Sequence, residues 1–168
     1  MNIIENECER VLRELYRFSD DIINFGNPIK DNRLEMLEDA LDYKLPIDFK
    51  YVLKKHNGIT LIGTEIYGFD AAFRGNSLEK IYEFEHNIAD NKMSREFLPF
   101  SPDGRGNHYC LNLTKIIDGV CPIVFWQWDY DYPRIKDVEE CNGSFLSWIE
   151  EVMLEWNLEN YNYDGTSK

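Results

Sequence analysis

The segment from Leu45 to Gly58, LPIDFKYVLKKHNG, constrains the fold most, because it encodes one complete helix together with both of its ends. Pro46 suits a first helical position, where its missing N–H would have no partner. Asn57-Gly58 supplies a residue that tolerates positive φ, the conformation that closes many helices. Apolar positions recur at i, i+3, i+4 and i+7, which predicts an inward face made of Phe49, Val52, Leu53 and His56.

Helical periodicity also predicts helices over residues 2–18, 31–43 and 77–89, and from residue 144 onwards. The last two begin at a serine, a preferred N-cap residue. The apolar residues of the 77–89 helix are Leu78, Ile81, Phe84 and Ile88. The final helix has a strong amphipathic stripe, which consists of Phe145, Trp148, Ile149, Val152 and Trp156.

The middle of the chain has the pattern of strands and turns. Residues 59–69 read as extended, 108–113 as a short strand and 120–128 as a central strand that continues to Tyr132. Turn-forming residues at 101–107 and 118–119 separate them. The order of helices, strands and a closing helix predicts a single α+β domain with a mostly antiparallel sheet. The acidic tail, residues 159–168, is expected to be frayed.

Charge limits the classes of partner. The chain has 31 acidic and 18 basic residues and a formal net charge of −13. Binding to nucleic acid or to an anionic membrane requires cations, so direct binding to either is not expected. A strong negative field attracts basic proteins, although it also serves solubility alone. There is no apolar run of about 20 residues, and the acidic N-terminus does not resemble a secretory signal, so we expect a cytoplasmic protein.

The first candidate partner-binding surface is an acidic ridge on the 31–43 helix. Like charges at i,i+4 destabilise a helix slightly, so stability alone does not favour such a ridge. An ordinary solvated helix face is the alternative interpretation. The residues at this helical spacing are Asp31, Glu35, Glu38 and Asp42.

The second candidate is the acidic-aromatic run that follows the central strand. Continued strand alternation would place Trp126, Trp128, Tyr130 and Tyr132 on one face and the aspartates on the other. Tyrosine and tryptophan often anchor interfaces. The alternative is that the tryptophans belong to the core and only the aspartates meet water. The candidate residues are Asp129, Tyr130, Asp131 and Tyr132.

Catalytic and metal-binding patterns are incomplete. His108 and Cys110 share a strand face, and a metal site there would add Cys121 or another group, but the second ligand pair that such a site needs is missing. Asp129 and Asp131 lack a third group for acid–base chemistry. The four cysteines contain no C-x-x-C pair and are interpreted as reduced, mostly buried thiols. We therefore expect no catalytic residue, metal or cofactor, and His56 is interpreted as structural.

Five motifs occur in one order over residues 31–156, and together they resemble the Smi/Knr-type branch of the SUKH superfamily. They are the Leu45–Gly58 helix, I-Y-G-F from Ile66, D-G-x-G-N-x-Y-C-L-N-L from Asp103, P-I-V-F-W-x-W-D from Pro122 and F-L-x-W-I from Phe145. The resemblance implies that residues 1–168 form one α+β domain that binds proteins and is not an enzyme.

The resemblance also implies a function. Bacterial members are mostly immunity proteins that neutralise a toxin delivered between competing cells, often a nuclease, whereas fungal relatives regulate cell-wall assembly. The expectation is stoichiometric occlusion of a cognate protein toxin, a basic nuclease, with a non-enzymatic regulatory module as the alternative. Asn107 and Asn112 replace aspartates that many members carry, which places any role of a carboxylate there in question.

Overall fold

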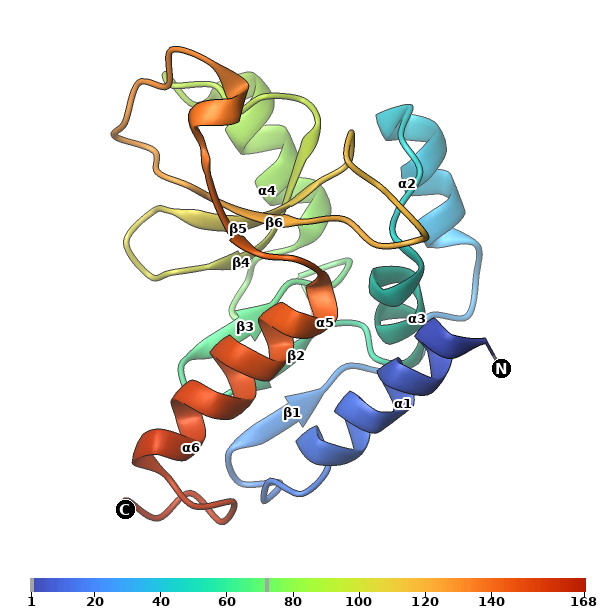
Figure 1. Ribbon diagram of the computed structural model, residues 1–168, viewed down its shortest axis with the longest axis vertical. Helices are drawn as coiled ribbons and strands as arrows, with labels where there is room; N and C mark the ends of the chain where they lie inside the picture. The colour runs from blue at the N-terminus through green and yellow to red at the C-terminus, as the bar shows by residue number, and fades with distance from the viewer. Residues whose placement is uncertain (1, 72) are drawn as a thin grey trace.

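Two antiparallel sheets form the centre of the computed structural model, which describes residues 2–71 and 73–168 (Figure 1). The first sheet contains β1 (Ile23–Phe25), β2 (Ile59–Leu61) and β3 (Thr64–Ile66), in that order. The second contains β4 (Phe97–Pro102), β5 (His108–Asn112), β6 (Ile123–Trp126) and β7 (Glu139–Asn142). This arrangement confirms the α+β prediction, with two sheets where one was expected.

Helices surround the sheets. The N-terminal helices are α1 (Ile3–Leu15), α2 (Arg33–Leu41) and α3 (Ile47–Lys55). Helix α4 (Leu78–Glu83) continues as a π-helical turn over Phe84–Ile88, and a short 3-10 turn covers Ile135–Asp137. The C-terminal helix combines α5 (Phe145–Trp148), a π-helical segment (Ile149–Glu155) and α6 (Trp156–Asn160). In residues 2–71 and 73–168, no helix is long and apolar enough to cross a bilayer.

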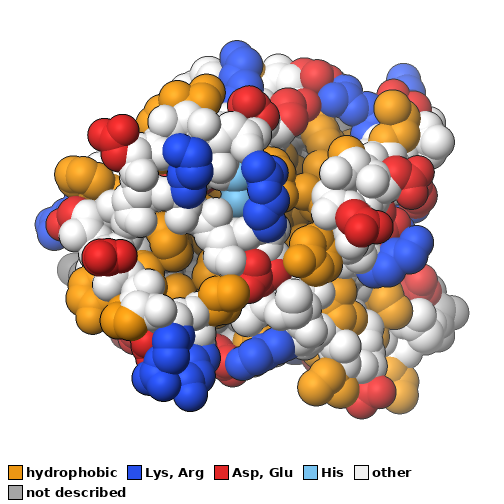
Figure 2. Space-filling view, turned by 90° about the horizontal axis from the view of Figure 1, so that it is seen from above, with side chains coloured by type: hydrophobic (Ala, Val, Ile, Leu, Met, Phe, Trp, Pro, Cys, Tyr) orange, Lys and Arg blue, Asp and Glu red, His pale blue; other side chains and the backbone are white. Residues whose placement is uncertain are grey.

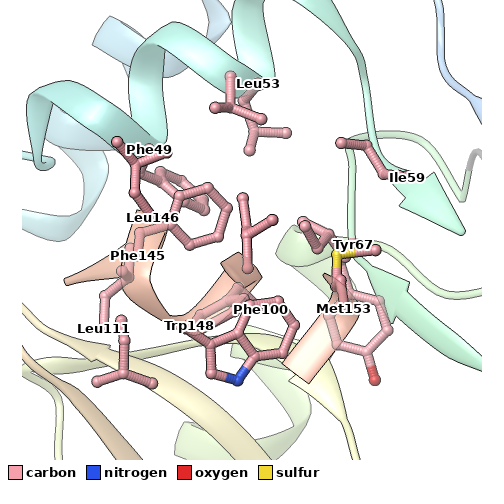
Figure 3. Packing of buried hydrophobic residues seen from close by; sticks show 14 of the residues in the cluster. Phe49, Leu53, Ile59, Tyr67, Phe100, Leu111, Phe145, Leu146, Trp148 and Met153 are labelled. Atoms are coloured by element: carbon pink, nitrogen blue, oxygen red, sulfur yellow. The ribbon is translucent and has the colours of Figure 1, made fainter. Parts of the chain in front are cut away.

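The main core fills the space between α3, α5 and one face of the second sheet (Figure 3). Its centre is aromatic: the Phe49 and Phe145 rings lie 5.1 Å apart, and Phe100 and Trp148 lie 4.8 Å apart. The N–H of Tyr67 donates to the carbonyl of Phe100 at 2.8 Å and connects the two sheets. The apolar faces predicted for α3 and α5 therefore meet in one core.

Asp48, in the LPIDF motif, connects two helix N-termini. Its buried carboxylate accepts hydrogen bonds from the N–H of Phe49 at 2.8 Å and of Leu146 at 3.4 Å. Burial raises the pKa of Asp48 to about 6, and the backbone donors oppose this rise. The first N–H groups of a helix have no partner within it, so this one carboxylate satisfies a buried N–H donor in the first turn of both α3 and α5.

The other face of the second sheet covers a smaller apolar cluster. It lies beneath the segments that precede β4 and follow β6, and Cys110 contacts Met93 there at 3.8 Å between the sulfurs. Three of the four cysteines are buried and all are free, which agrees with the interpretation as reduced thiols. The buried members are Met93, Phe97, Cys110, Val124, Trp126 and Val138.

Two predictions are wrong, one about where a strand ends and one about the C-terminal tail. Strand β6 ends at Trp126, so residues 127–132 form a loop and do not alternate between two faces. The tail is not frayed: Tyr161 pairs with Ser167, and Tyr163 packs on Phe18 with ring centroids 4.8 Å apart. The N–H of Ser19 donates to the Tyr163 carbonyl at 2.8 Å, so contacts with the N-terminal region hold the tail.

Candidate partner-binding site

The loop at residues 127–132 is fixed by hydrogen bonds from neighbouring segments. The side-chain amide of Asn91 donates to the carbonyls of Trp128 and Tyr130, both at 2.9 Å. The N–H of Trp128 donates to Asn107 Oδ1 at 3.2 Å, and the N–H of Gln127 donates to the Tyr132 hydroxyl at 3.1 Å. Trp128 and Tyr130 are held in place although about half of each side chain is exposed.

The turn from Asp103 to Asn107 supports the Trp128 ring. The Asp103 carboxylate accepts from the N–H groups of Arg105 and Asn107 and from Asn107 Nδ2, at 2.7, 3.0 and 2.8 Å. Asn107 thus donates to Asp103 and accepts from Trp128, and an ionised aspartate there has no proton to donate. The indole N–H of Trp128 donates to the Arg105 carbonyl at 3.0 Å.

Gly106 allows Trp128 to approach the turn. Its φ is +91°, and a Cβ atom built there would lie 2.7 Å from Trp128 Cδ1. We expect Gly106→Ala to displace the Trp128 ring and to lower the free energy of unfolding by about 1–3 kcal/mol through backbone strain. The measurement is the chemical shift of the Trp128 indole N–H, combined with urea unfolding.

Gly104→Ala is the matched control for this prediction. Gly104 has a similar φ, +85°, but a Cβ atom there would meet no atom within 4 Å. The control therefore includes the backbone strain without the clash. An unchanged Trp128 signal in Gly106→Ala, or the same change in both variants, would show that Gly106 does not position the ring.

A cavity of about 710 Å³ opens between this turn, α4 and the loop. Phe84 and Trp128 line it, with 47% and 54% of their surfaces exposed. Buried Tyr67, Glu85 and His108 also line it and form its floor. Figure 2 shows a hollowed face on which hydrophobic side chains lie among acidic and basic ones. We call Phe84 and Trp128, together with Tyr130, an exposed residue of the same loop that does not line the cavity, the aromatic rim.

The cavity floor contains a buried imidazole nitrogen with no hydrogen-bond partner among the described residues. The Tyr67 hydroxyl lies 3.0 Å from His108 Nε2, and His108 Nδ1 lies 3.7 Å from Glu85 Oε1. His108 Nδ1 has no hydrogen-bond partner among residues 2–71 and 73–168. Burial lowers the pKa of His108 to about 4, so its imidazole is neutral at pH 7, and burial raises the pKa of Glu85.

The π-helical turn after α4 explains why the sequence pattern did not reveal this floor. The apolar spacing placed Phe84 and Ile88 on the inward face of the 77–89 helix, but both are exposed. The wider π turn buries Glu85 and His86 there instead. Glu85 was absent from the predicted site residues, and its only sequence signal is a position inside an apolar pattern. The sequence pattern indicates His108 only as a candidate metal ligand.

The acidic ridge does not exist as one free surface. Glu38 is 6% exposed, so its prediction as a surface residue is wrong. Its carboxylate accepts from the Leu45 N–H at 2.7 Å and from Lys50 Nζ at 2.9 Å. Glu35 accepts from Lys54 Nζ at 2.6 Å. Both glutamates therefore join α2 to α3.

The remaining predicted site residues lie in two separate places. Asp31 precedes α2 and Asp42 caps its C-terminus with φ of +59°, and both are exposed. Asp129, Tyr130 and Asp131 are exposed in the loop, where Tyr132 is half-buried against Trp126. In Figure 1, α2 and the segment after β6 lie on opposite sides of α4, so the structure does not bring the two candidates together.

We expect Glu38→Gln to lower the free energy of unfolding by about 1.5–3 kcal/mol, the typical contribution of hydrogen bonds to a charged group. Burial raises the pKa of Glu38, but the Leu45 N–H and Lys50 outweigh it, so the pKa lies below its usual value. The stabilisation is therefore present above about pH 4.3, the ordinary glutamate pKa, and is lost on acidification. Urea unfolding at pH 7 measures the change, with exposed Asp39→Asn on the same helix as control. Equal stability of both variants would contradict the buried contacts.

Comparison with known families gives a match that covers the region containing the site. The SUKH_6 family model, described as SMI1-KNR4 cell-wall, matches residues 31–149, which are 119 of the 168 residues. The match includes α2, α3, every residue that lines the cavity and the 127–132 loop. It leaves out α1, β1, most of the C-terminal helix and the tail. This chain belongs to the SMI1-KNR4 family of the SUKH superfamily.

Proposed function

We propose that this protein is an immunity protein, which binds a cognate protein toxin and neutralises it by stoichiometric occlusion. The observation that carries the proposal is the fixed aromatic rim around a cavity on a strongly acidic chain. SUKH domains are generally protein-interaction modules, so a protein is the expected class of partner.

The aromatic rim supplies the anchors of the proposed interface. Phe84, Trp128 and Tyr130 each expose about half of their surface to water. Aromatic side chains with large exposed areas are frequent among the residues that dominate binding energy. The hydrogen bonds that Asn91 donates to the loop and that Asn107 accepts from it fix the loop before binding, which reduces the entropy lost on association.

Acidic residues supply the proposed electrostatic attraction. Asp129 and Asp131 lie in the same loop, and Asp90 lines the cavity. A net charge of −13 attracts a basic nuclease and, for complementary partners, raises association toward ~10⁸ M⁻¹s⁻¹ at low salt. We therefore assign these aspartates to steering the encounter and the aromatic rim to holding the complex.

The proposal assigns the chain no chemistry of its own. An imidazole acts best as a general acid or base when its pKa lies near the working pH. Burial lowers the pKa of His108 to about 4, far from that range. We assign the His108–Glu85 pair to binding and not to catalysis.

Co-expression tests the proposal. A toxin domain encoded beside this gene is expressed in cells with and without this protein. Restored growth and a co-purifying complex of defined stoichiometry are expected. Continued growth arrest without a complex, while the protein remains soluble, would contradict immunity.

The second candidate function is a non-enzymatic regulatory module. The description of the matching family model contains the term cell-wall, and fungal relatives regulate cell-wall assembly. This description favours the regulatory module. This candidate predicts a partner that binds the same face but is not toxic. A complex that forms in cells without any protection against a toxin would support it over immunity.

A further inference from the structure

The geometry points to the cavity beneath the aromatic rim as a site for one arginine side chain of a protein partner, whose guanidinium would meet Glu85 and His108. This inference deepens the proposed function and rests on it for the partner being a protein.

The floor offers hydrogen-bond acceptors to a ligand. Glu85 is 4% exposed, and its Oε1 lies 3.7 Å from His108 Nδ1, which is too long for a hydrogen bond. When His108 carries its hydrogen on Nε2 and donates it to the Tyr67 hydroxyl, Nδ1 becomes a free acceptor beside Glu85. Buried polar groups normally have partners, so a ligand with several N–H donors would satisfy a floor that the chain leaves unsatisfied.

The walls favour a planar cation. Phe84, Trp128, Ile81 and Pro102 line the cavity, so apolar and aromatic surface surrounds the path to the floor. A guanidinium is planar, stacks on aromatic faces and is more weakly hydrated than an ammonium. It also presents five donors, which suits a carboxylate next to an imidazole nitrogen. These properties favour arginine over lysine.

The mouth carries one charge of each sign. Arg105 and Asp90 both line the cavity and are exposed. Exposed charges are screened by water and salt, so Arg105 opposes a cation less than the buried Glu85 attracts it. The net charge of −13 further favours a cationic ligand over an anionic one.

The test uses the purified full chain and N-acetyl-arginine amide as the probe. Titration is followed by ¹H–¹⁵N NMR of the Trp128 indole N–H, which is assigned by its loss in Trp128→Phe. A saturable shift in the millimolar range is expected, with the citrulline analogue, a neutral near-isostere, at least tenfold weaker. The lysine analogue is also expected to bind more weakly.

Glu85→Gln is expected to weaken arginine-amide binding at least tenfold, whereas Glu159→Gln, in an exposed position on the C-terminal helix, is expected to leave it unchanged. A dispersed spectrum verifies that each variant is folded, and the citrulline comparison uses only the wild-type protein. Absence of a saturable shift, equal binding of citrulline or lysine analogues, or full binding by Glu85→Gln would overturn the inference. These outcomes do not depend on the toxin experiment, so failure of immunity and failure of the arginine site are distinguishable.

Discussion

Replacing Asp48 with alanine is expected to lower the free energy of unfolding by about 2–6 kcal/mol, because two buried N–H donors lose their acceptor at a cost of about 1–3 kcal/mol each. The carboxylate is fully buried and accepts from the N–H groups of Phe49 and Leu146. Alanine would leave both donors buried without their partner, at the first turns of α3 and α5. Chemical unfolding at pH 7 measures the loss, with exposed Asp20→Ala as control.

The effect of Asp48→Ala is also expected to depend on pH. Because burial raises the pKa of Asp48 in the folded state to about 6, above its usual value, its contribution to stability is greatest below about pH 4 and decreases as pH rises through 6. The difference between wild type and Asp48→Ala should therefore be larger at pH 4 than at pH 7. A difference that grows from pH 4 to pH 7, or a variant as stable as the wild type, would contradict this role of Asp48.

Replacing Trp128 with alanine is expected to weaken partner binding at least a hundredfold, about 2.7 kcal/mol or more, which is the range of interface hot spots. Trp128 lines the cavity, is 54% exposed and is fixed by Asn91, Asn107 and the Arg105 carbonyl. Truncation removes the largest side chain of the aromatic rim. Calorimetric titration with the co-purified partner measures the change in affinity.

Trp156→Ala is the matched control for the interface. Trp156 is 46% exposed, but it begins α6 and lines a different surface depression beside Tyr109 and Glu139. The same truncation on another face should leave affinity within about twofold, an energy below ~0.5 kcal/mol. If the two variants lose the same affinity, or if Trp128→Ala binds as tightly as the wild type, the aromatic rim is not the interface.

The elements with local signals were predictable from the sequence. The LPIDFKYVLKKHNG segment contains its own start, apolar face and stop, and it forms α3 almost as expected. Ser77 and Ser144 cap the helices that they were expected to begin. Strands β1, β4 and β7 were missed. β1 and β7 have only three or four residues, which cannot establish a period. β4 contains Pro99 and Pro102, which argue against a strand, and its last two residues were assigned to the turn at 101–107.

The site was less predictable because its geometry depends on long-range contacts. The sequence of the loop after Trp126 has an alternating pattern, but hydrogen bonds with Asn91 and Asn107 give its backbone another course. Glu38 has the spacing of a surface residue, and only the approach of Lys50 and Leu45 explains its burial. No periodicity rule places Glu85 at the cavity floor, because a π-helical turn shifts the register there.

Hydrogen exchange of the complex tests most directly whether the face around the aromatic rim binds the partner. Backbone amides are compared in the free protein and in the co-purified complex by mass spectrometry. The predicted result is slowed exchange in residues 84–91, 103–107 and 127–132, with little change in α2 and α6. Protection confined to α2 or to the C-terminal helix, with unchanged exchange around Trp128, would contradict the proposed interface.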